Sequence, residues 1–278
     1  MIKSVHDIKN ARILISNDDG INSEGIIKLE RIAKSLSKDV WIVAPESEQS
    51  ASGHSLTLRS PLRIDRLAKN RYSINGTPTD CVVMAINKII HDKPPDIVLS
   101  GINYGLNIGE DLTYSGTIAV AIEATLVGIP AIALSQGCNE KDPNSKIDWS
   151  AAEIHAGNII KRLLSTVWPK NVLINVNFPP VPSKRVKGIE ITRMGYRKIG
   201  DEIIEGNDPK GRSYFWIGAQ KLSNNNPPGT DLGAIQNDLI SISPLSINLT
   251  HKAMMRKLRE TFKEQGFNQD GQIKDEVL

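Results

Sequence analysis

The 278-residue sequence predicts an α/β protein with a doubly wound, mostly parallel Rossmann-like sheet, in a three-layer α/β/α arrangement. Short apolar runs alternate with segments of helical periodicity from residue 11 to residue 177, which is the order that builds parallel sheets. After residues 179–182 (Pro-Pro-Val-Pro), Gly, Asn and Pro become frequent and the apolar runs become short. That change predicts an antiparallel β-hairpin appendage, followed by a C-terminal helix.

The first strand, helix and strand form the clearest unit. The apolar run at 11–16 predicts a buried strand. Residues 23–37 place apolar side chains at positions 26, 29, 32, 33 and 36, the spacing of a helix with one buried face. The run at 40–44 predicts the next strand. This order predicts parallel pairing through a right-handed crossover.

The later core elements follow the same alternation. Thr77, Pro78 and Asp80 form a capping-box-like start for a helix that extends to about residue 90. The nearly all-apolar run at 117–127 predicts a buried helix. The remaining expected elements are short strands at 62–64 and 72–74, core strands at 96–100, 129–135 and 172–177, and an amphipathic helix at 151–167.

The C-terminal third has a different expected organisation. Short strands are expected at 188–194, 213–217 and 239–243, and a final helix at 251–265. We expect a single domain over residues 1–278. Its expected parts are a core at about 11–184 plus 236–267, a protruding arm at about 185–235, and a polar tail at 268–278.

The composition narrows the classes of function. The net charge is +3 and the Lys and Arg residues are scattered, so the basic stripe typical of nucleic-acid binding is missing. A small anionic substrate remains compatible with this charge. No apolar run approaches the ~18 residues of a membrane span, and residues 1–10 are too polar for a signal peptide. The lack of an apolar span leads us to expect no membrane partner. The two cysteines have no motif spacing, so we expect a cytoplasmic protein with reduced thiols.

Four polar loops fall at the carboxyl ends of predicted strands, where open α/β sheets bind ligands. They are residues 17–22, 45–54, 101–117 and 136–144. The first contains Asp18 and Asp19, directly before Gly20, where the backbone can turn and bring both carboxylates together. Two such charges repel unless a cation lies between them, and a hard divalent cation prefers oxygen ligands. The alternative is an Asp-Asp-Gly turn in which one aspartate is a simple cap.

The second loop is crowded with hydroxyl groups that can bind a metal ion or a phosphate. Its candidate residues are Ser47, Ser50, Ser52, His54 and Ser55. The alternative for the serines is an ordinary solvated loop. His54 is either a proton donor or incidental to function.

The third loop, Ser-Gly-Ile-Asn-Tyr-Gly-Leu-Asn-Ile-Gly at 100–109, is rich in glycine and asparagine. It is neither a P-loop nor a dinucleotide-binding fingerprint, because the Gly-Lys-Ser/Thr ending and the fingerprint spacing are both missing. The run Tyr-Ser-Gly-Thr at 114–117 then opens the buried helix, whose free N–H groups suit a phosphate. The alternative here is plain capping of the helix by Ser115.

Taken together, these segments resemble the SurE family, the stationary-phase survival proteins that act as nucleoside-monophosphate phosphatases. The resemblance extends in order along nearly the whole chain. The matching runs are those at 13–21, 43–50, 76–81, 96–103, 114–117, 228–231 and 241–245. Two features depart from the family pattern: ten residues precede the first strand, and the second loop has fewer basic residues than in many relatives.

The resemblance implies a specific site and activity. The implied ligands of one divalent metal ion per subunit, Mg²⁺ or Mn²⁺, are Asp18, Asp19, Ser50 and Asn103. The implied phosphate contacts are Asn107, Ser115, Gly116 and Thr117. Family members hydrolyse nucleoside 5′- and 3′-monophosphates, and some also act on polyphosphate. They form homodimers or homotetramers by exchanging C-terminal elements, which would give the arm at 185–235 a role.

The expected mechanism is attack by a metal-activated water, with Asp18 or Asp19 as the catalytic group that orients or deprotonates it. A nucleophilic aspartate is a weaker alternative, because the usual Asp-x-Asp pattern is missing. A nucleotide-binding regulatory module without turnover is the alternative from another class of protein. A nucleotide-cofactor oxidoreductase is disfavoured by the lack of a fingerprint glycine loop.

Overall fold

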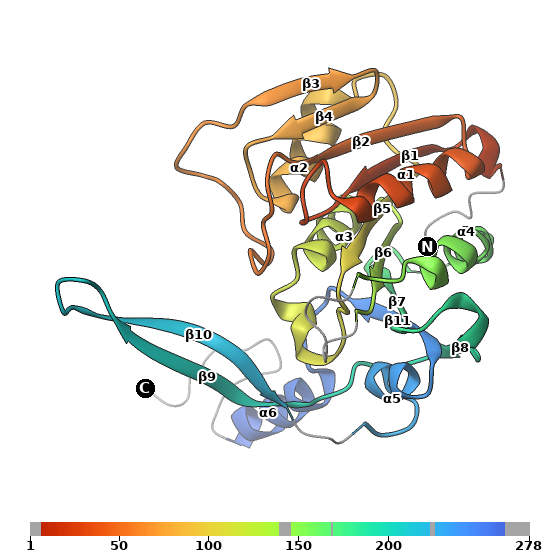
Figure 1. Cartoon of the computed structure of the whole chain (residues 1–278). Helices are drawn as coiled ribbons and strands as arrows, with labels where there is room; N and C mark the ends of the chain where they lie inside the picture. Colours follow the sequence, from red (N-terminus) through yellow and green to blue (C-terminus); the bar gives the residue numbers. More distant parts are fainter. Residues whose placement is uncertain (1–6, 139–145, 168, 223–225, 265–278) are drawn as a thin grey trace, which may run out of the picture. The chain divides into compact units, whose positions relative to one another are not determined.

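The computed structural model describes residues 7–138, 146–167, 169–222 and 226–264. Its contacts divide the chain into two compact units, Met1–Leu245 and Ser246–Leu278. The first unit contains the sheet, its covering helices and a β-hairpin (Figure 1). The second contains helix α6 (Lys252–Glu264), which matches the predicted C-terminal helix over its described part. The predicted tail at 268–278 lies outside the described residues, and the single-domain division remains a prediction.

A nine-stranded sheet in the order β3-β4-β2-β1-β5-β6-β7-β11-β8 forms the centre of the first unit. Its strands are β1 (Arg12–Ser16), β2 (Asp39–Pro45), β3 (Ile64–Ala68), β4 (Arg71–Ile74), β5 (Ile97–Tyr104), β6 (Ala131–Gln136), β7 (Val172–Phe178), β8 (Gly188–Ile191) and β11 (Leu239–Ser246). Strand β1 pairs in parallel with both β2 and β5, while β3 is antiparallel to β4 at one edge. Strands β2 to β4 therefore lie on one side of β1, and β5 to β7 lie on the other. This reversal of strand order places a topological switch point between β1 and β5.

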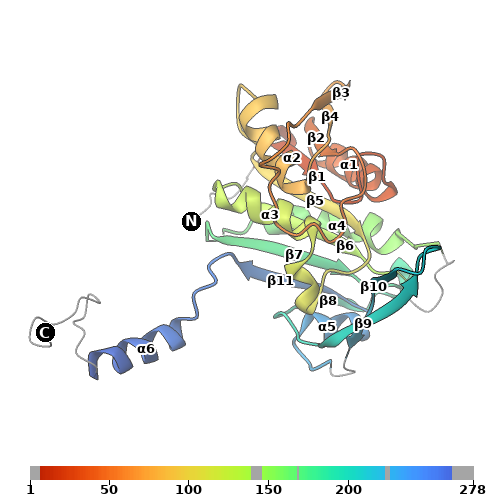
Figure 2. The same ribbon diagram turned by 90° about the vertical axis from the view of Figure 1, so that its left-hand side faces the viewer.

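Helices cover both faces of the sheet, as predicted (Figures 1 and 2). Helices α1 (Glu24–Leu36) and α4 (Ser150–Leu164) pack together on one face, and α2 (Pro78–Met84) and α3 (Gly116–Leu126) on the other. Side chains of β1 alternate between the two faces, and Ile13 and Ile15 join the apolar cluster that contains α1 and α4. The doubly wound, three-layer prediction is confirmed.

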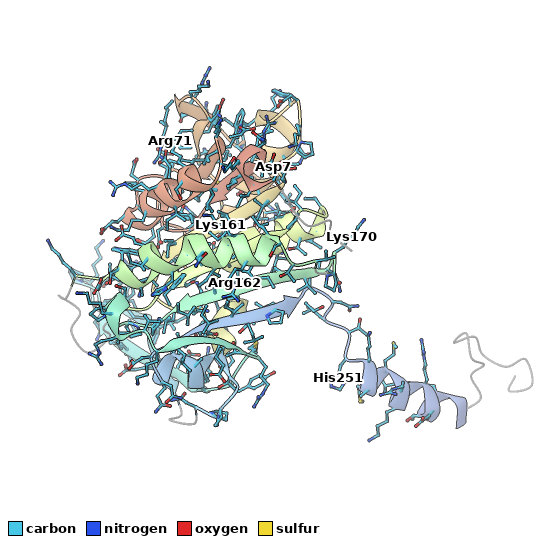
Figure 3. All side chains as sticks on the ribbon, turned by 90° about the vertical axis from the view of Figure 1, so that its right-hand side faces the viewer. Asp7, Arg71, Lys161, Arg162, Lys170 and His251 are labelled. Carbon is cyan, nitrogen blue, oxygen red and sulfur yellow. The ribbon has the colours of Figure 1, made fainter. Side chains whose placement is uncertain are left out.

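Local signals in the sequence account for the helices that flank the site. The buried residues of α1 include all five predicted apolar positions, 26, 29, 32, 33 and 36. Thr77 and Asp80 form a complete capping box around Pro78, and α2 continues as a π-helix at Ala85–Ile89 to the predicted end near residue 90. At the far end of α4, Lys161 and Arg162 lie in the last turn, where cations complement the helix dipole (Figure 3).

The largest difference from expectation concerns the C-terminal strands. Strand β8 pairs in parallel with β11 and belongs to the main sheet, so the strand expected at 188–194 is not part of the appendage. The antiparallel hairpin consists of β9 (Lys198–Asn207) and β10 (Ser213–Leu222), and β9 was not predicted. Its sequence mixes charged and apolar residues because the ribbon leaves both faces largely exposed. The short helix α5 (Asp231–Gln236) was also not predicted.

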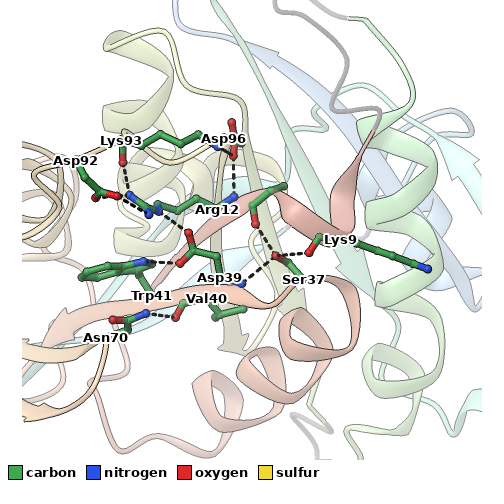
Figure 4. Close-up of polar contacts among 11 residues, drawn as sticks. Lys9, Arg12, Ser37, Asp39, Val40, Trp41, Asn70, Asp92, Lys93 and Asp96 are labelled. Carbon is green, nitrogen blue, oxygen red and sulfur yellow. Dashed lines mark hydrogen bonds and ion pairs between the residues drawn. The ribbon is translucent and has the colours of Figure 1, made fainter.

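At the amino end of β1, Arg12 joins three neighbouring segments (Figure 4). Its guanidinium Nε lies 2.7 Å from Asp39 Oδ2 at the start of β2, and its Nη1 lies 2.7 Å from Asp92 Oδ1. Its backbone N–H donates to Asp96 Oδ2 directly before β5, at 2.7 Å. The guanidinium also lies over the Trp41 ring, 5.5 Å from the ring centroid. These contacts hold the amino ends of β1, β2 and β5 together, and the switch point lies at the opposite ends.

Candidate metal and phosphate site

The turn after β1 is shaped by Asn17. Its side-chain Nδ2 donates to the carbonyl of Gly20 at 3.0 Å and to Ser23 Oγ at 2.8 Å. Gly20 has a positive φ of 94°, which suits glycine at this turn. The turn directs Asp18 and Asp19 out of the carboxyl end of β1. The signal for Asn17 was available in the sequence, since Asn is a typical turn former before Asp-Asp-Gly.

Asp18 lies against the N-terminus of α3. Its side chain is buried, at 5% exposure, and its Oδ1 accepts a hydrogen bond from the Thr117 hydroxyl at 2.5 Å. The same hydroxyl lies 3.0 Å from Asn103 Oδ1. A Cβ on Gly116 would lie 2.7 Å from the Asp18 Cβ, so only glycine allows this approach. The structure therefore brings together four of the predicted residues, Asp18 from the first loop and Asn103, Gly116 and Thr117 from the third.

Asn103 is held at the end of β5 by its own amide. Its Nδ2 donates to the carbonyls of Tyr104 and Gly105, at 3.2 and 3.0 Å, which leaves Oδ1 facing Thr117. Gly101 precedes it with a φ of 121°, and a Cβ there would lie 2.3 Å from the Leu134 carbonyl oxygen. The glycine in Ser-Gly-Ile-Asn thus allows β5 to pass close to β6 and present the asparagine oxygen.

The pKa values of Asp18 and Asp19 are both raised. Burial raises the pKa of Asp18, against the hydrogen bond from Thr117, which lowers it. Burial, then the charge of Asp18, raises the pKa of Asp19 to about 7, although the Tyr104 N–H, 3.1 Å from Asp19 Oδ2, lowers it. Two carboxylates in this position favour a cation beside them.

The donor set suits a hard cation. Among the described residues, no group of three or more His, Cys, Asp or Glu is placed to hold a metal ion. The oxygens available here are instead two carboxylates together with the neutral oxygens of Asn103 and Ser50. All-oxygen sets with one or two carboxylates are the ones that Mg²⁺ uses in proteins. The residues present therefore fit the divalent ion that the sequence led us to expect.

Ser50 lies at the edge of this group. Its hydroxyl donates to Glu48 Oε1 at 2.8 Å, and its loop is attached to the first loop by the Gln49 N–H, which donates to the Asp18 carbonyl at 2.8 Å. Ser50 lines the same cavity as Asp18 and Asn103, whereas Ser52 does not appear in its wall. His54 points elsewhere and lies 2.9 Å from Glu123 on α3.

Asn107 rests on a buried network of amides. Its Nδ2 donates to Ser135 Oγ at 2.9 Å, and its backbone N–H donates to Asn177 Oδ1 at 2.9 Å. Its carbonyl accepts from the side chains of Asn175 and Asn177. The two asparagines interrupt the apolar run of β7, a signal that was visible in the sequence but not used. Their side chains position the loop that contains Asn107.

A cavity of about 490 Å³ opens over these residues. Its wall contains five of the predicted residues, and residues that sequence reasoning missed. The lining residues are Asp18, Ser50, Ala51, Asn103, Tyr104, Asn107, Asp111, Tyr114, Ser115, Lys198, Asp201, Ile217 and Gly218. Ser115 Oγ accepts from the Ile118 N–H at 3.1 Å, so its side chain caps α3, as the alternative interpretation held. A cap leaves the remaining N–H groups of the helix start able to bind an anion.

A comparison with known families decides the assignment. The model of the family described as "Survival protein SurE" matches residues 13–201. The chain belongs to the SurE family. A SurE protein of Paramagnetospirillum magneticum, named "5'-nucleotidase SurE", is 55% identical over 258 residues, covering 93% of this chain and 98% of that protein. The protein of the same name from Rhodospirillum rubrum is 48% identical, covering 94% of this chain and 100% of its own length.

A solved SurE structure agrees with the fold. The crystal structure of the SurE protein from Aquifex aeolicus superimposes with a TM-score of 0.78 at 37% identity, covering 90% of this chain and 99% of that one. Within the described part of this SurE chain, no helix is long and apolar enough to cross a membrane. A second cavity, of about 480 Å³, adjoins Asp19. Tyr104 lines both cavities.

Proposed function

We propose that this SurE protein hydrolyses nucleoside 5′-monophosphates to nucleoside and inorganic phosphate in a divalent-metal-dependent reaction. The observation that carries the proposal is the meeting of Asp18, Asn103 and Thr117 at the switch point of the sheet, against the N-terminus of α3. The names of the relatives support the same substrate class. Activity toward 3′-monophosphates and polyphosphate belongs to the proposal as well.

Asp18, Asp19, Ser50 and Asn103 would hold one Mg²⁺ or Mn²⁺ ion. When bound, such an ion neutralises phosphate charge and lowers the pKa of a water molecule. The raised pKa values of both aspartates support this placement, because a cation would relieve the repulsion between them. Thr117 keeps Asp18 and Asn103 in fixed relative positions, which an ordered ligand set requires.

The start of α3 would bind the phosphate. The backbone N–H groups of Gly116 and Thr117 lie at the positive end of the helix beside the Asp18 carboxylate, whose pKa they lower, and would donate to phosphate oxygens as well. Asn107 uses one hydrogen of its amide for Ser135 and has a second to donate into the cavity. Ser115 contributes by capping the helix, so that these donors keep their direction. Such preorganised donors stabilise charge that develops on phosphorus oxygens during the reaction.

The proton of the attacking water would pass to Asp18 or Asp19, the two carboxylates of the proposed metal site. Asp18 is buried and Asp19 is partly buried, and each carboxylate accepts a hydrogen bond from a neighbouring donor. A carboxylate in a fixed position can orient the water for attack, which is a proximity effect. The turn at Gly20 positions both carboxylates for this role.

The direct test is release of inorganic phosphate from AMP by the purified full-length protein. We expect release with Mn²⁺ or Mg²⁺ and none after treatment with EDTA, with recovery when the metal is restored. Binding of AMP without release under any metal would favour the regulatory module and reject the enzyme. A panel of 5′- and 3′-monophosphates and polyphosphate then defines the substrate range.

We also propose that the protein forms a homodimer or homotetramer through the β9–β10 hairpin. Large apolar side chains are exposed along it, and Trp216 and Ile217 are 66% and 80% exposed. Apolar surface of this kind is typical of protein–protein interfaces. A hairpin of two strands is itself only marginally stable in water, which supports a partner that covers it.

A further inference from the structure

The base of the hairpin is attached to the segment that leads into α3. That segment is η3 (Gly109–Thr113), a short 3-10 helix. The carboxylate of Glu110 accepts the backbone N–H groups of Arg197 and Lys198, at 3.0 and 3.3 Å. The Arg197 guanidinium lies 2.8 Å from Asp111 Oδ2. These contacts fix the direction in which the first side chains of β9 leave the strand.

The contacts place the Lys198 side chain in the wall of the substrate cavity. Its Nζ lies 3.1 Å from Asp201 Oδ1, 3.4 Å from the Tyr114 hydroxyl and 4.9 Å from the Tyr114 ring centroid. Tyr114 directly precedes Ser115, the cap of α3. Lys198 is only 22% exposed, and it lines the same cavity as Asp18 and Asn107. The hairpin thus contributes part of the space in which the phosphate would bind.

Lys198 differs in charge from the other ionisable residues that line the cavity. Among its described lining residues, Asp18, Asp111 and Asp201 are acidic and Lys198 is the one cation. Asp111 is already paired with Arg197, outside the cavity wall. The hydrogen bond that Lys198 donates to the Asp201 carboxylate raises the pKa of Lys198, so its ammonium group is charged at neutral pH. A dianionic phosphate monoester entering this cavity would meet that ammonium group.

We infer that Lys198, supplied by the β9–β10 hairpin, is a substrate-binding residue whose ammonium group contacts the phosphate of the nucleotide. This inference rests on the proposed function and deepens it. It gives the hairpin a second task besides association of subunits. A flexible ammonium group with three donors can keep Asp201 as one partner and bind a phosphate oxygen with another hydrogen.

The test compares two variants that break the same ion pair. Lys198→Met and Asp201→Asn both remove the ion pair between Lys198 and Asp201, but only the first removes the cation. We expect Lys198→Met to weaken binding of inorganic phosphate and to raise KM for AMP by about 10–100-fold, the range of a charge-assisted hydrogen bond. Asp201→Asn should bind phosphate as tightly as the wild type or more tightly. Lys198→Arg should recover most of the affinity.

The measurements separate this inference from the proposed function. Release of phosphate from AMP by the wild type, with and without EDTA, tests the enzyme by itself. Calorimetry of inorganic phosphate binding to the Mn²⁺-loaded protein tests Lys198 without any turnover. Equal weakening of phosphate binding in Lys198→Met and Asp201→Asn, or no weakening in either, would overturn the inference. Circular dichroism and light scattering verify that both variants keep the fold and subunit number of the wild type.

Discussion

The Thr117 hydroxyl donates to Asp18 Oδ1 at 2.5 Å across 99 positions of the sequence, and it lies 3.0 Å from Asn103 Oδ1 as well. One hydroxyl group therefore connects the ends of β1 and β5 at the start of α3. The three residues come from loops that the topology brings to one edge of the sheet.

Thr117→Val removes the hydroxyl and keeps the shape of the side chain. We expect kcat/KM for AMP to fall by about 10²-fold, because small displacements of ligating or catalytic groups have effects of this size. Steady-state kinetics at saturating Mn²⁺ measure the change. Thr125→Val is the matched control, because Thr125 is also buried on α3 and its hydroxyl donates to the Ala121 carbonyl of the same helix. An equal loss in both variants would contradict the special role of Thr117.

Gly116→Ala places a methyl group where the Asp18 side chain lies. The added Cβ would be 2.7 Å from the Asp18 Cβ, so the aspartate or the helix start must move. We expect a loss of about 10²-fold or more in turnover of AMP. Gly157→Ala on α4 is the control, since its Cβ would meet only Ile32 at 3.7 Å. That control should keep full activity and raise the free energy of unfolding by about 0.5–1 kcal/mol.

Asp19→Asn removes one carboxylate from the proposed metal site. We expect a larger loss than removal of a single phosphate donor, which typically costs about 10²–10³-fold in turnover. Titration of activity against Mn²⁺ should also show a higher metal concentration at half-maximal rate. Asp65→Asn on the exposed strand β3 serves as the control for loss of a negative charge. Normal metal-dependent turnover by Asp19→Asn would reject its assignment as a ligand.

Arg12→Met tests the amino end of the sheet, away from the site. The guanidinium is buried between Asp39 and Asp92, so its loss should lower the free energy of unfolding by about 1–3 kcal/mol. Urea denaturation measures this change, and KM for AMP should not change. Lys34→Met removes an exposed ion pair with Glu30 on α1 and should change stability by less than about 0.5 kcal/mol.

The effect of Arg12→Met should also depend on pH. Arg12 lowers the pKa of Asp92 to about 2, below the value of about 3.9 for an unfolded aspartate. A lowered carboxyl pKa stabilises the fold above the unfolded pKa, and this stabilisation is lost as the pH falls through the folded pKa. The stability difference between wild type and Arg12→Met should therefore be constant above about pH 5 and shrink between about pH 4 and pH 2. A difference that grows toward acid pH would contradict the ion pair.

Phe215→Ser combined with Trp216→Ser tests association through the hairpin. Both side chains are exposed on β10, and neither lines the cavity. Loss of this apolar area should shift the protein to a smaller species in light scattering at micromolar concentration. The paired control is Leu58→Ser, which removes an apolar side chain that is even more exposed, between β2 and β3. An unchanged mass in the hairpin variant would place the interface elsewhere.

Much of the fold could be predicted because its signals are local. The buried face of α1 follows from apolar spacing, and the start of α2 follows from Thr77, Pro78 and Asp80, whose contacts span three residues. The same holds for Asp18 and Asp19, since a polar turn after a buried strand places them at the binding edge of any parallel sheet. The strand β8 was misplaced because its partner, β11, lies about fifty residues further along, and no local pattern shows which sheet a short strand joins.

The sequence by itself determined the α/β/α layers, the loops at the carboxyl ends of the strands and the polar residues in those loops. It could do so because periodicity and turn chemistry act over a few neighbouring residues. Only the tertiary structure decided which of those groups meet. Thr117 bonds to Asp18, and Lys198 bonds to Tyr114. The side chains of Asn175 and Asn177 donate to the Asn107 carbonyl. Each of these contacts joins segments that are far apart in the chain. Contacts of this kind depend on burial and shape complementarity across the whole unit, which no short segment of sequence contains.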